Sequence, residues 1–330
     1  MRIVIHGQQA FGKAVLDRLL EGADDIAAVF CPPDAEGRPI DPLKERALQA
    51  GLPVHQLSSW KTDEAARLLA AQEADLCVMA YVTQIVPSRC LDLPAKGSIQ
   101  YHPSLLPRHR GPSSINWPII AGETRTGLSI FWPDDGLDTG PILLQKEVDI
   151  GPDDTVGSLY FDHLFPMGVE AMIEAVELVR AGNPPRIAQD EADATYEGWC
   201  RAEDAKVDWS QSAERVHDLI RGTDPQPGAW TTIGGARLNL YGSRRASATG
   251  RPGEVMEITD RGMTVATGLG GVSVARVRPE GSRAKISPQE WADQAGLGPG
   301  VVLDDVAQAQ PDASSVGAAQ VARDKDRAGP

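Results

Sequence analysis

Short apolar runs alternate with amphipathic segments along the first hundred residues, and this alternation is the strongest constraint on the fold. The amphipathic segments carry apolar residues at helical spacing, as at Phe11, Val15 and Leu19. Asp41 and Pro42 predict the N-cap and the first residue of a further short helix, with Gly51 after its end. The apolar runs predict buried strands at Arg2–Ile5, Ile26–Phe30, Val54–Leu57, Asp75–Tyr81 and Gly97–Tyr101. Strands that alternate with helices favour an α/β fold, with a mostly parallel, Rossmann-like sheet and helices on its faces.

The next hundred residues extend this pattern. Two further strands are predicted at Thr126–Trp132 and Ile142–Ile150. A single long helix is predicted over Asp154–Arg180, with Gly182 as its end. The segment Asn183–Ala194 is rich in Pro, Asp, Glu and Ala and predicts a linker. We therefore expect residues 1–200 to form the α/β domain.

Residues 201–304 differ in pattern. A predicted helix, Ala213–Ile220, precedes several short β runs, and the Gly234-Gly235 pair marks a tight hairpin between two of them. The runs are Ala229–Ile233, Ala236–Tyr241, Glu254–Ile258, Met263–Thr267 and Val272–Val277. They predict a small β-rich domain, an OB-like barrel or an open sheet. Residues 305–330 offer little apolar surface to bury and are expected to form a disordered tail.

The charge balance narrows the class of partner. The 330 residues carry a net charge of −14, which disfavours binding to nucleic acid or to anionic membranes. No apolar run is long enough to span a bilayer, and the initial MRIVIHGQQ predicts a strand rather than a signal peptide. The four cysteines form no C-x-x-C pair, so we expect reduced core thiols in a cytoplasmic protein.

The segment from Gly7 to Gly12 lies where a dinucleotide fingerprint would be. The middle glycine of G-x-G-x-x-G is absent, which disfavours close backbone approach to a pyrophosphate. An NAD-dependent oxidoreductase is therefore the weaker hypothesis, and a plain turn between strand and helix is favoured.

His102 lies at the carboxyl end of a predicted strand, which is where open α/β sheets bind ligands. Pro103 restricts the backbone behind it, and the Arg108–Arg110 run adds local positive charge to an acidic protein. These neighbours favour a functional histidine over a structural one.

Asp138 lies in a glycine-flanked loop after another predicted strand. Alone, the loop is typical of an acidic turn, and its spacing does not fit an EF-hand. We expect His102 and Asp138 to lie at neighbouring strand ends of one sheet. There the carboxylate would favour a charged imidazolium, which donates a hydrogen bond to an oxyanion or a proton to a leaving amine. A zinc site of His102, His109 and Asp138 is less favoured, because no third histidine or cysteine lies nearby.

At these residues the sequence resembles a known family. The runs Ser98–Gly111 and Ile130–Gln145, with H-P-S-L-L-P-R followed by D-G-L-D-T-G, resemble the 10-formyltetrahydrofolate-dependent formyltransferase superfamily. The formyl-hydrolase domain of 10-formyltetrahydrofolate dehydrogenase is the most similar member, and methionyl-tRNA formyltransferase is more distant. The resemblance also covers Met1–Pro33, Phe161–Pro185, Thr195–Gly198 and Ile220–Thr231. It implies a formyltransferase fold, 10-formyltetrahydrofolate as cosubstrate and no metal.

The resemblance implies that His102 and Asp138 are the catalytic pair. Protonated His102 would stabilise an oxyanion, while Asp138 orients the ring and positions or deprotonates the nucleophile. Many members carry an asparagine two residues before the histidine, where this chain has Gln100 with an amide one methylene further out. Because no serine or cysteine has a partner base, we expect no covalent acyl-enzyme.

The resemblance also implies the folate-binding positions. Gln84, Ile85 and Val86 match the loop that holds the pterin ring through backbone groups. The segment that lines the folate site matches Ser104, Leu105, Leu106 and Pro107.

The sequence leaves the formyl acceptor open. We favour a small-molecule amine, and the alternatives are water, which gives a 10-formyltetrahydrofolate hydrolase, and a carrier-bound phosphopantetheine thiol. Initiator tRNA is not favoured, because the net charge of −14 attracts phosphate poorly. A non-catalytic folate-binding protein is the alternative of another class, and retention of both His102 and Asp138 opposes it. We expect the second domain to select the acceptor or to form a homodimer contact.

Overall fold

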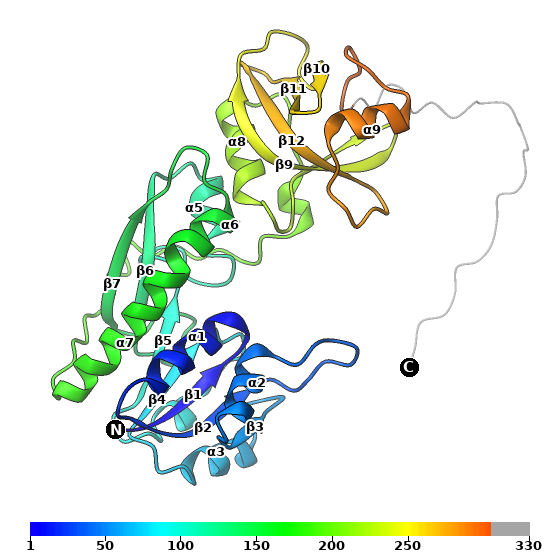
Figure 1. Cartoon of the computed structure of the whole chain (residues 1–330). Helices are drawn as coiled ribbons and strands as arrows, with labels where there is room; N and C mark the ends of the chain where they lie inside the picture. Colours follow the sequence, from blue (N-terminus) through cyan, green and yellow to red (C-terminus); the bar gives the residue numbers. More distant parts are fainter. Residues whose placement is uncertain (305–330) are drawn as a thin grey trace, which may run out of the picture.

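The computed structural model describes residues 1–304, which form two sheet-based units (Figure 1). The predicted tail at 305–330 lies outside the described residues. The first unit is a seven-stranded sheet in the order β3-β2-β1-β4-β5-β6-β7. Its strands are β1 (Arg2–Gly7), β2 (Asp25–Cys31), β3 (Val54–Gln56), β4 (Leu76–Ala80), β5 (Ser98–His102), β6 (Arg125–Phe131) and β7 (Ile142–Asp149).

The first five strands of this sheet are parallel, while β6 runs antiparallel to β5 and β7 runs antiparallel to β6. The order also reverses beside β1, since β2 and β3 lie on one side of it and β4 and β5 on the other. Such a switch point is where open α/β sheets bind ligands, outside the carboxyl ends of the strands. The predicted fold class, a mostly parallel α/β sheet followed by a β-rich unit, is confirmed.

Helices cover both faces of the first sheet. One core joins the sheet to α1 (Gln9–Leu20), α2 (Pro42–Gln49) and α7 (Phe165–Ala181). A second core on the opposite face includes side chains of α3 (Asp63–Ala70) and α4 (Ser88–Leu91). The predicted start of α2 is confirmed: the Asp41 side chain accepts hydrogen bonds from the main-chain N–H groups of Leu43 and Lys44.

The predicted helix over Asp154–Arg180 is helical from Val156 onwards, but it is not α-helical throughout. A short α6 (Val156–Ser158) passes into a π-helical turn, η1 (Leu159–Leu164), before α7 begins. Pro166, in the first turn of α7, has no N–H to donate to a carbonyl one turn earlier, so the α-helical ladder is interrupted there. The predicted end of the helix is confirmed, because Gly182 is left-handed at φ 96°.

The second unit is a five-stranded antiparallel sheet in the order β10-β11-β12-β9-β8. The predicted hairpin is confirmed, since Ile233 pairs with Ala236 across Gly234-Gly235. Two helices, α8 (Ala213–Gly222) and α9 (Pro288–Ala295), contact the sheet, and the sequence pattern had not indicated α9. The strands are β8 (Trp230–Ile233), β9 (Ala236–Ala246), β10 (Val255–Thr259), β11 (Gly262–Ala266) and β12 (Gly271–Pro279).

The two units meet where α8 packs against α5 (Asn116–Ile120), at the end of the first sheet that faces the second unit in Figure 1. The buried Asn116 amide donates to the main-chain oxygens of Gly222 and Gln226, at 2.9 and 3.0 Å. Between Met1 and Asp304, no helix has both the length and the apolar character needed to cross a membrane.

Candidate active site

His102 is the last residue of β5, and its side chain is buried, at 6% exposure. The ring Nε2 lies 2.9 Å from the main-chain oxygen of His109. Since a carbonyl oxygen only accepts hydrogen bonds, Nε2 carries a proton in this arrangement. The His109 carbonyl therefore fixes the ring orientation and directs Nδ1 to the opposite side.

Asp138 reaches His102 by a route that the sequence did not indicate. We expected two neighbouring strand ends at one edge of the sheet, but β6 is antiparallel to β5 and its last residue, Phe131, pairs with Gln100. The loop from 132 to 141 must therefore turn back towards His102. Asp138 in this loop is left-handed at φ 58°, and its buried Oδ2 lies 3.6 Å from Nδ1 of His102.

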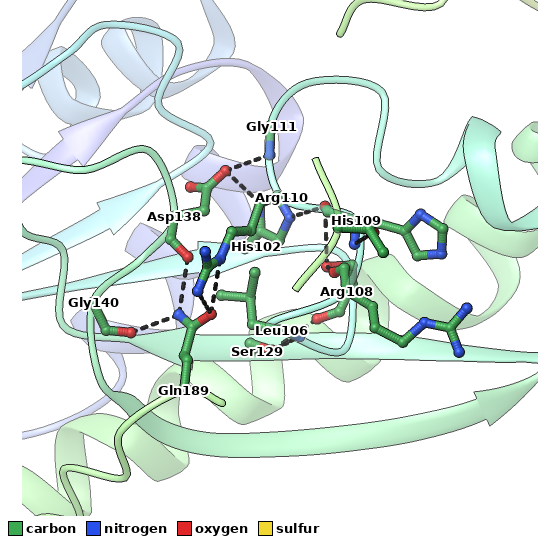
Figure 2. Close-up of polar contacts among 12 residues, drawn as sticks. His102, Leu106, Arg108, His109, Arg110, Gly111, Ser129, Asp138, Gly140 and Gln189 are labelled. Atoms are coloured by element: carbon green, nitrogen blue, oxygen red, sulfur yellow. Dashed lines mark hydrogen bonds and ion pairs between the residues drawn. The ribbon is translucent and has the colours of Figure 1, made fainter. Parts of the chain in front are cut away.

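The Asp138 carboxylate has a second partner. The main-chain N–H of Gly111 donates to Oδ2 at 2.8 Å, as Figure 2 shows. The His102 ring thus has the carbonyl oxygen of His109 facing one nitrogen and a carboxylate oxygen facing the other. A doubly protonated ring would present a donor to each of these oxygens.

Gln100 lies two residues before His102 on β5, so the two side chains point to the same face of the sheet. Gln100 is half-buried, and among residues 1–304 its side-chain amide has no hydrogen-bond partner. The amide is therefore available to a ligand that contacts His102.

The loop after β4 lies at the same edge of the sheet as His102, because β4 and β5 are parallel neighbours. Among the described residues, the main-chain N–H and C=O groups of Gln84, Ile85 and Val86 are bonded to no other group of the protein. Free main-chain donors and acceptors fit the recognition of a pterin ring, which presents both kinds of group.

The three side chains of this loop lie differently. The Gln84 amide donates to the main-chain oxygens of Leu57 and Ser58, at 3.0 and 3.1 Å, and so fastens the loop beside β3. Val86 is buried in the core, whereas Ile85 is 67% exposed. Ile85 is therefore the apolar side chain of the loop that can cover a bound ligand.

The segment from Ser104 to Pro107 is hydrogen-bonded to side chains of the strands β6 and β7. The Leu106 N–H donates to Ser129 Oγ, and the Leu106 carbonyl accepts from the amide of Gln145, at 3.1 and 2.9 Å. Ser104 and Leu106 are buried and serve this internal network, whereas Leu105 and Pro107 are only half-buried. Of the four predicted lining residues, Leu105 and Pro107 have side-chain surface left for a ligand.

The segment predicted as a linker is part of the site. Gln189 donates to the main-chain oxygens of Asp138 and Gly140, at 2.9 and 2.7 Å, and accepts from the Arg110 guanidinium. Arg110 is also paired with Glu191 and holds the pKa of that carboxyl below its usual range. No pattern in the sequence points to Gln189, because it lies 51 positions from Asp138 and no motif includes it.

His109 does not complete a metal site. Its ring Nε2 lies 3.1 Å from Glu123 Oε1 and its Nδ1 lies 3.3 Å from Glu197 Oε2, while only its main-chain oxygen contacts His102. The zinc set of His102, His109 and Asp138 is thus not brought together. From Met1 to Asp304, no group of three or more His, Cys, Asp or Glu side chains is arranged to hold a metal ion.

Comparison with known proteins matches both units of the chain. A family model described as formyl transferase matches residues 1–176, and one described as formyl transferase, C-terminal domain, matches residues 200–296. Among solved structures, HypX from Aquifex aeolicus in complex with tetrahydrofolic acid has a TM-score of 0.65 at 19% identity, over 89% of this chain and 47% of HypX. The sugar 3N-formyl transferase WlaRD has a TM-score of 0.66 at 17% identity, over 86% of this chain and 98% of WlaRD. These likenesses show a shared fold.

Two curated relatives are similar in sequence. Mitochondrial 10-formyltetrahydrofolate dehydrogenase of Homo sapiens is 46% identical over 263 residues, which are 78% of this chain but only 28% of the dehydrogenase. Methionyl-tRNA formyltransferase of Jannaschia sp. (strain CCS1) is 40% identical over 309 residues, which are 92% of this chain and 100% of that protein. With both units matched and the fold shared, the chain belongs to the formyl transferase family and has the folate-dependent formyltransferase fold.

Proposed function

We propose that the protein transfers a formyl group from 10-formyltetrahydrofolate to an amine, with His102 and Asp138 as the catalytic pair. The observation that carries the proposal is the buried contact of the His102 ring with the Asp138 carboxylate, at 3.6 Å. This pair lies beside a loop with free main-chain groups, at the edge of the sheet where such folds bind ligands.

Each residue has a distinct role in this proposal. When bound, 10-formyltetrahydrofolate supplies an activated formyl group, and the main-chain groups of residues 84–86 hold its pterin ring. In a protonated ring, the Nδ1–H of His102, which at 3.6 Å makes no hydrogen bond to Asp138, donates to the formyl oxygen as this oxygen gains negative charge, and the Gln100 amide donates to the same oxygen. The amine nitrogen bonds to the formyl carbon and Asp138 accepts its proton, while protonated His102 gives a proton to the folate nitrogen as the bond from this nitrogen to the formyl carbon breaks. Passage of the proton from Asp138 to His102 then restores the pair.

The relatives support transfer to an amine over the alternatives. The chain covers the whole of a relative named as a formyltransferase, and less than a third of the one named as a dehydrogenase. Hydrolysis, or transfer to a carrier thiol, is the second candidate because the dehydrogenase has the higher identity of the two. The net charge of −14 is the argument against a tRNA acceptor.

The first test follows tetrahydrofolate release by the purified protein, first with 10-formyltetrahydrofolate alone and then with primary amines or methionyl-tRNA added. We expect release that requires an amine and falls by at least about 100-fold in His102→Ala, with folate affinity changed little. A thermal melt of the variant controls for folding.

The other outcomes are equally informative. Rapid release without an acceptor, dependent on His102, would replace transfer by hydrolysis. Formylation of methionyl-tRNA would overturn the argument from net charge. Absence of folate binding by the wild-type protein would overturn the proposal as a whole.

A further inference from the structure

The Asp138 loop depends on distant contacts for its shape. Asp134, Asp135, Gly136 and Leu137 are exposed, whereas Asp138 itself is buried and left-handed at φ 58°. A left-handed conformation is costly for a residue with a side chain and persists only when its surroundings enforce it. The residues that impose this conformation therefore control where the carboxylate points.

Gln189 makes the contact that spans this turn. Its two amide protons are donated to the carbonyl oxygens of Asp138 and Gly140, on either side of Thr139. A single amide thus fixes two carbonyls that are two residues apart. Gln189 is half-buried although its neighbours Ala188 and Asp190 are exposed, so the side chain points into the site.

Arg110 holds the Gln189 amide in this orientation. The oxygen of the amide accepts from Nε and Nη2 of Arg110, at 3.1 and 2.9 Å. The same guanidinium makes a bidentate pair with Glu191, at 2.9 and 2.6 Å. Arg110 is only 7% exposed, and these bonds make the 180° flip of the Gln189 amide unfavourable, because Arg110 has no acceptor to offer.

Three consecutive residues, 109–111, therefore position the His102–Asp138 pair. The carbonyl of His109 accepts from His102, the side chain of Arg110 orients Gln189, and the N–H of Gly111 binds the Asp138 carboxylate (Figure 2). This tripeptide is itself fastened to the segment after the predicted linker, since Arg110 N–H donates to the Thr195 carbonyl and Glu197 N–H to the Arg110 carbonyl.

We propose that Gln189 is a positioning residue, which holds the Asp138 carboxylate against His102 through the carbonyls of Asp138 and Gly140. The inference rests on the proposed function of His102 and Asp138. It assigns the segment between the two units a role in the chemistry, in addition to its role as a connection.

Two substitutions test this role. Gln189→Met keeps a similar length and removes both donors, and Gln189→Glu keeps the partner for Arg110 but places an oxygen against the two carbonyls. We expect kcat to fall roughly 10- to 100-fold in both, because a small misplacement of a catalytic group is sufficient for such a loss. The dissociation constant for 10-formyltetrahydrofolate should change less than about threefold.

Gln72→Met is the matched control. The Gln72 amide also donates to a main-chain carbonyl, that of Leu68 in α3, on the other side of the sheet from the α1–α7 core. This variant should keep wild-type kcat and wild-type hydrogen exchange in the Asp138 loop.

Two further readouts separate positioning from general stability. Amide hydrogen exchange of residues 134–140 should be faster in both Gln189 variants and unchanged in Gln72→Met. In single-turnover experiments, Gln189→Glu should have little further effect in an Asp138→Asn background, because the group that it positions is already lost.

The proposal is overturned if both Gln189 variants keep kcat within twofold of wild type, or if their losses multiply fully with that of Asp138→Asn. If the wild-type protein shows no turnover that depends on His102, the proposed function fails. The exchange of residues 134–140 then still decides the inference, because unchanged exchange in both Gln189 variants would show that the Gln189 amide does not hold the loop.

Discussion

His6 is a buried, neutral histidine beneath the predicted pterin loop. It lies in β1 at 2% exposure, and the Trp60 indole N–H donates to its Nε2 at 3.1 Å. Burial lowers the pKa of His6 to about 3, against a smaller opposing effect of the neighbouring Gln84. Because Gln84 also fastens the loop that carries Ile85, protonation of His6 would disturb the predicted folate site as well as the core.

We predict that His6 makes the fold less stable in acid. Its pKa is lower in the folded chain than in the unfolded chain, so below pH 6.5 only the unfolded chain gains the proton, and stability is lost as the pH falls from 6.5 towards 3. At pH 5 the loss is about 2 kcal/mol relative to pH 7.

The measurement is urea unfolding of wild type and His6→Gln between pH 7 and pH 4.5. Gln at this position keeps an acceptor for Trp60 and does not titrate. The variant should lose less stability than wild type over this range, and parallel curves would contradict the prediction. Comparison with wild type cancels the contributions of other groups, including His217, whose pKa is also lowered by burial.

At the scale of elements, two left-handed glycines make a matched pair. Gly111 has φ 94° and Gly182 has φ 96°, so a Cβ would strain the backbone equally at both. Around Gly182 a Cβ would meet nothing within 4 Å, whereas at Gly111 it would lie 2.7 Å from the Glu197 carbonyl oxygen and 2.9 Å from the Tyr196 ring. Of these two glycines, only Gly111 also donates a main-chain hydrogen bond to the Asp138 carboxylate.

We predict that Gly182→Ala lowers the free energy of unfolding by about 1 kcal/mol and leaves kcat unchanged. Gly111→Ala should lower it by about 3 kcal/mol and should also reduce kcat, because the Asp138 donor moves with the backbone. Denaturant unfolding and steady-state kinetics measure both. Equal effects of the two variants on kcat would contradict the assignment of the Gly111 N–H to the site.

Several ends of helices and strands can be predicted from the local sequence, whereas the π-helical turn before α7 cannot. The Asp41 cap, the Gly182 end and the Gly234-Gly235 hairpin were predicted and are confirmed, because each depends on residues within one turn. The π-helical turn at Leu159–Leu164 was missed, because its apolar spacing is close to that of an α-helix and only the position of Pro166 marks the break.

At the scale of the whole molecule, Asn116 joins the two units. Its amide nitrogen donates to two carbonyls, those of Gly222 at the end of α8 and of Gln226, where α5 and α8 pack together. Ile120 is also close, since a Cβ on Gly222 would lie 2.6 Å from its Cγ1. Loss of the Asn116 amide would leave the carbonyl of the buried Gly222 without a donor.

We predict that Asn116→Ala lowers the free energy of unfolding by about 2 kcal/mol and the melting temperature by about 4–8 °C. Asn183→Ala, at an exposed asparagine after α7, is the control and should leave the melting temperature within about 1 °C. Differential scanning calorimetry of both variants is the measurement. An unchanged melting temperature for Asn116→Ala would show that the two hydrogen bonds of the Asn116 side chain make no net contribution to stability.

The sequence alone determined the features that depend on near neighbours. Alternating apolar runs specify the parallel sheet, because each buried strand needs helices to cover its faces. His102 could be located from sequence because it is the last residue of the buried strand β5, at the edge where such sheets bind ligands.

Only the tertiary structure decided how the site is assembled. Asp138 reaches His102 because β6 is antiparallel and its loop turns back, and strand direction is set by pairing with distant segments rather than by local spacing. Arg110 and Gln189 have ordinary local contexts, yet they hold the loop across 51 positions of sequence. Contacts between residues so far apart depend on packing of the whole first unit, which leaves no local pattern in either segment.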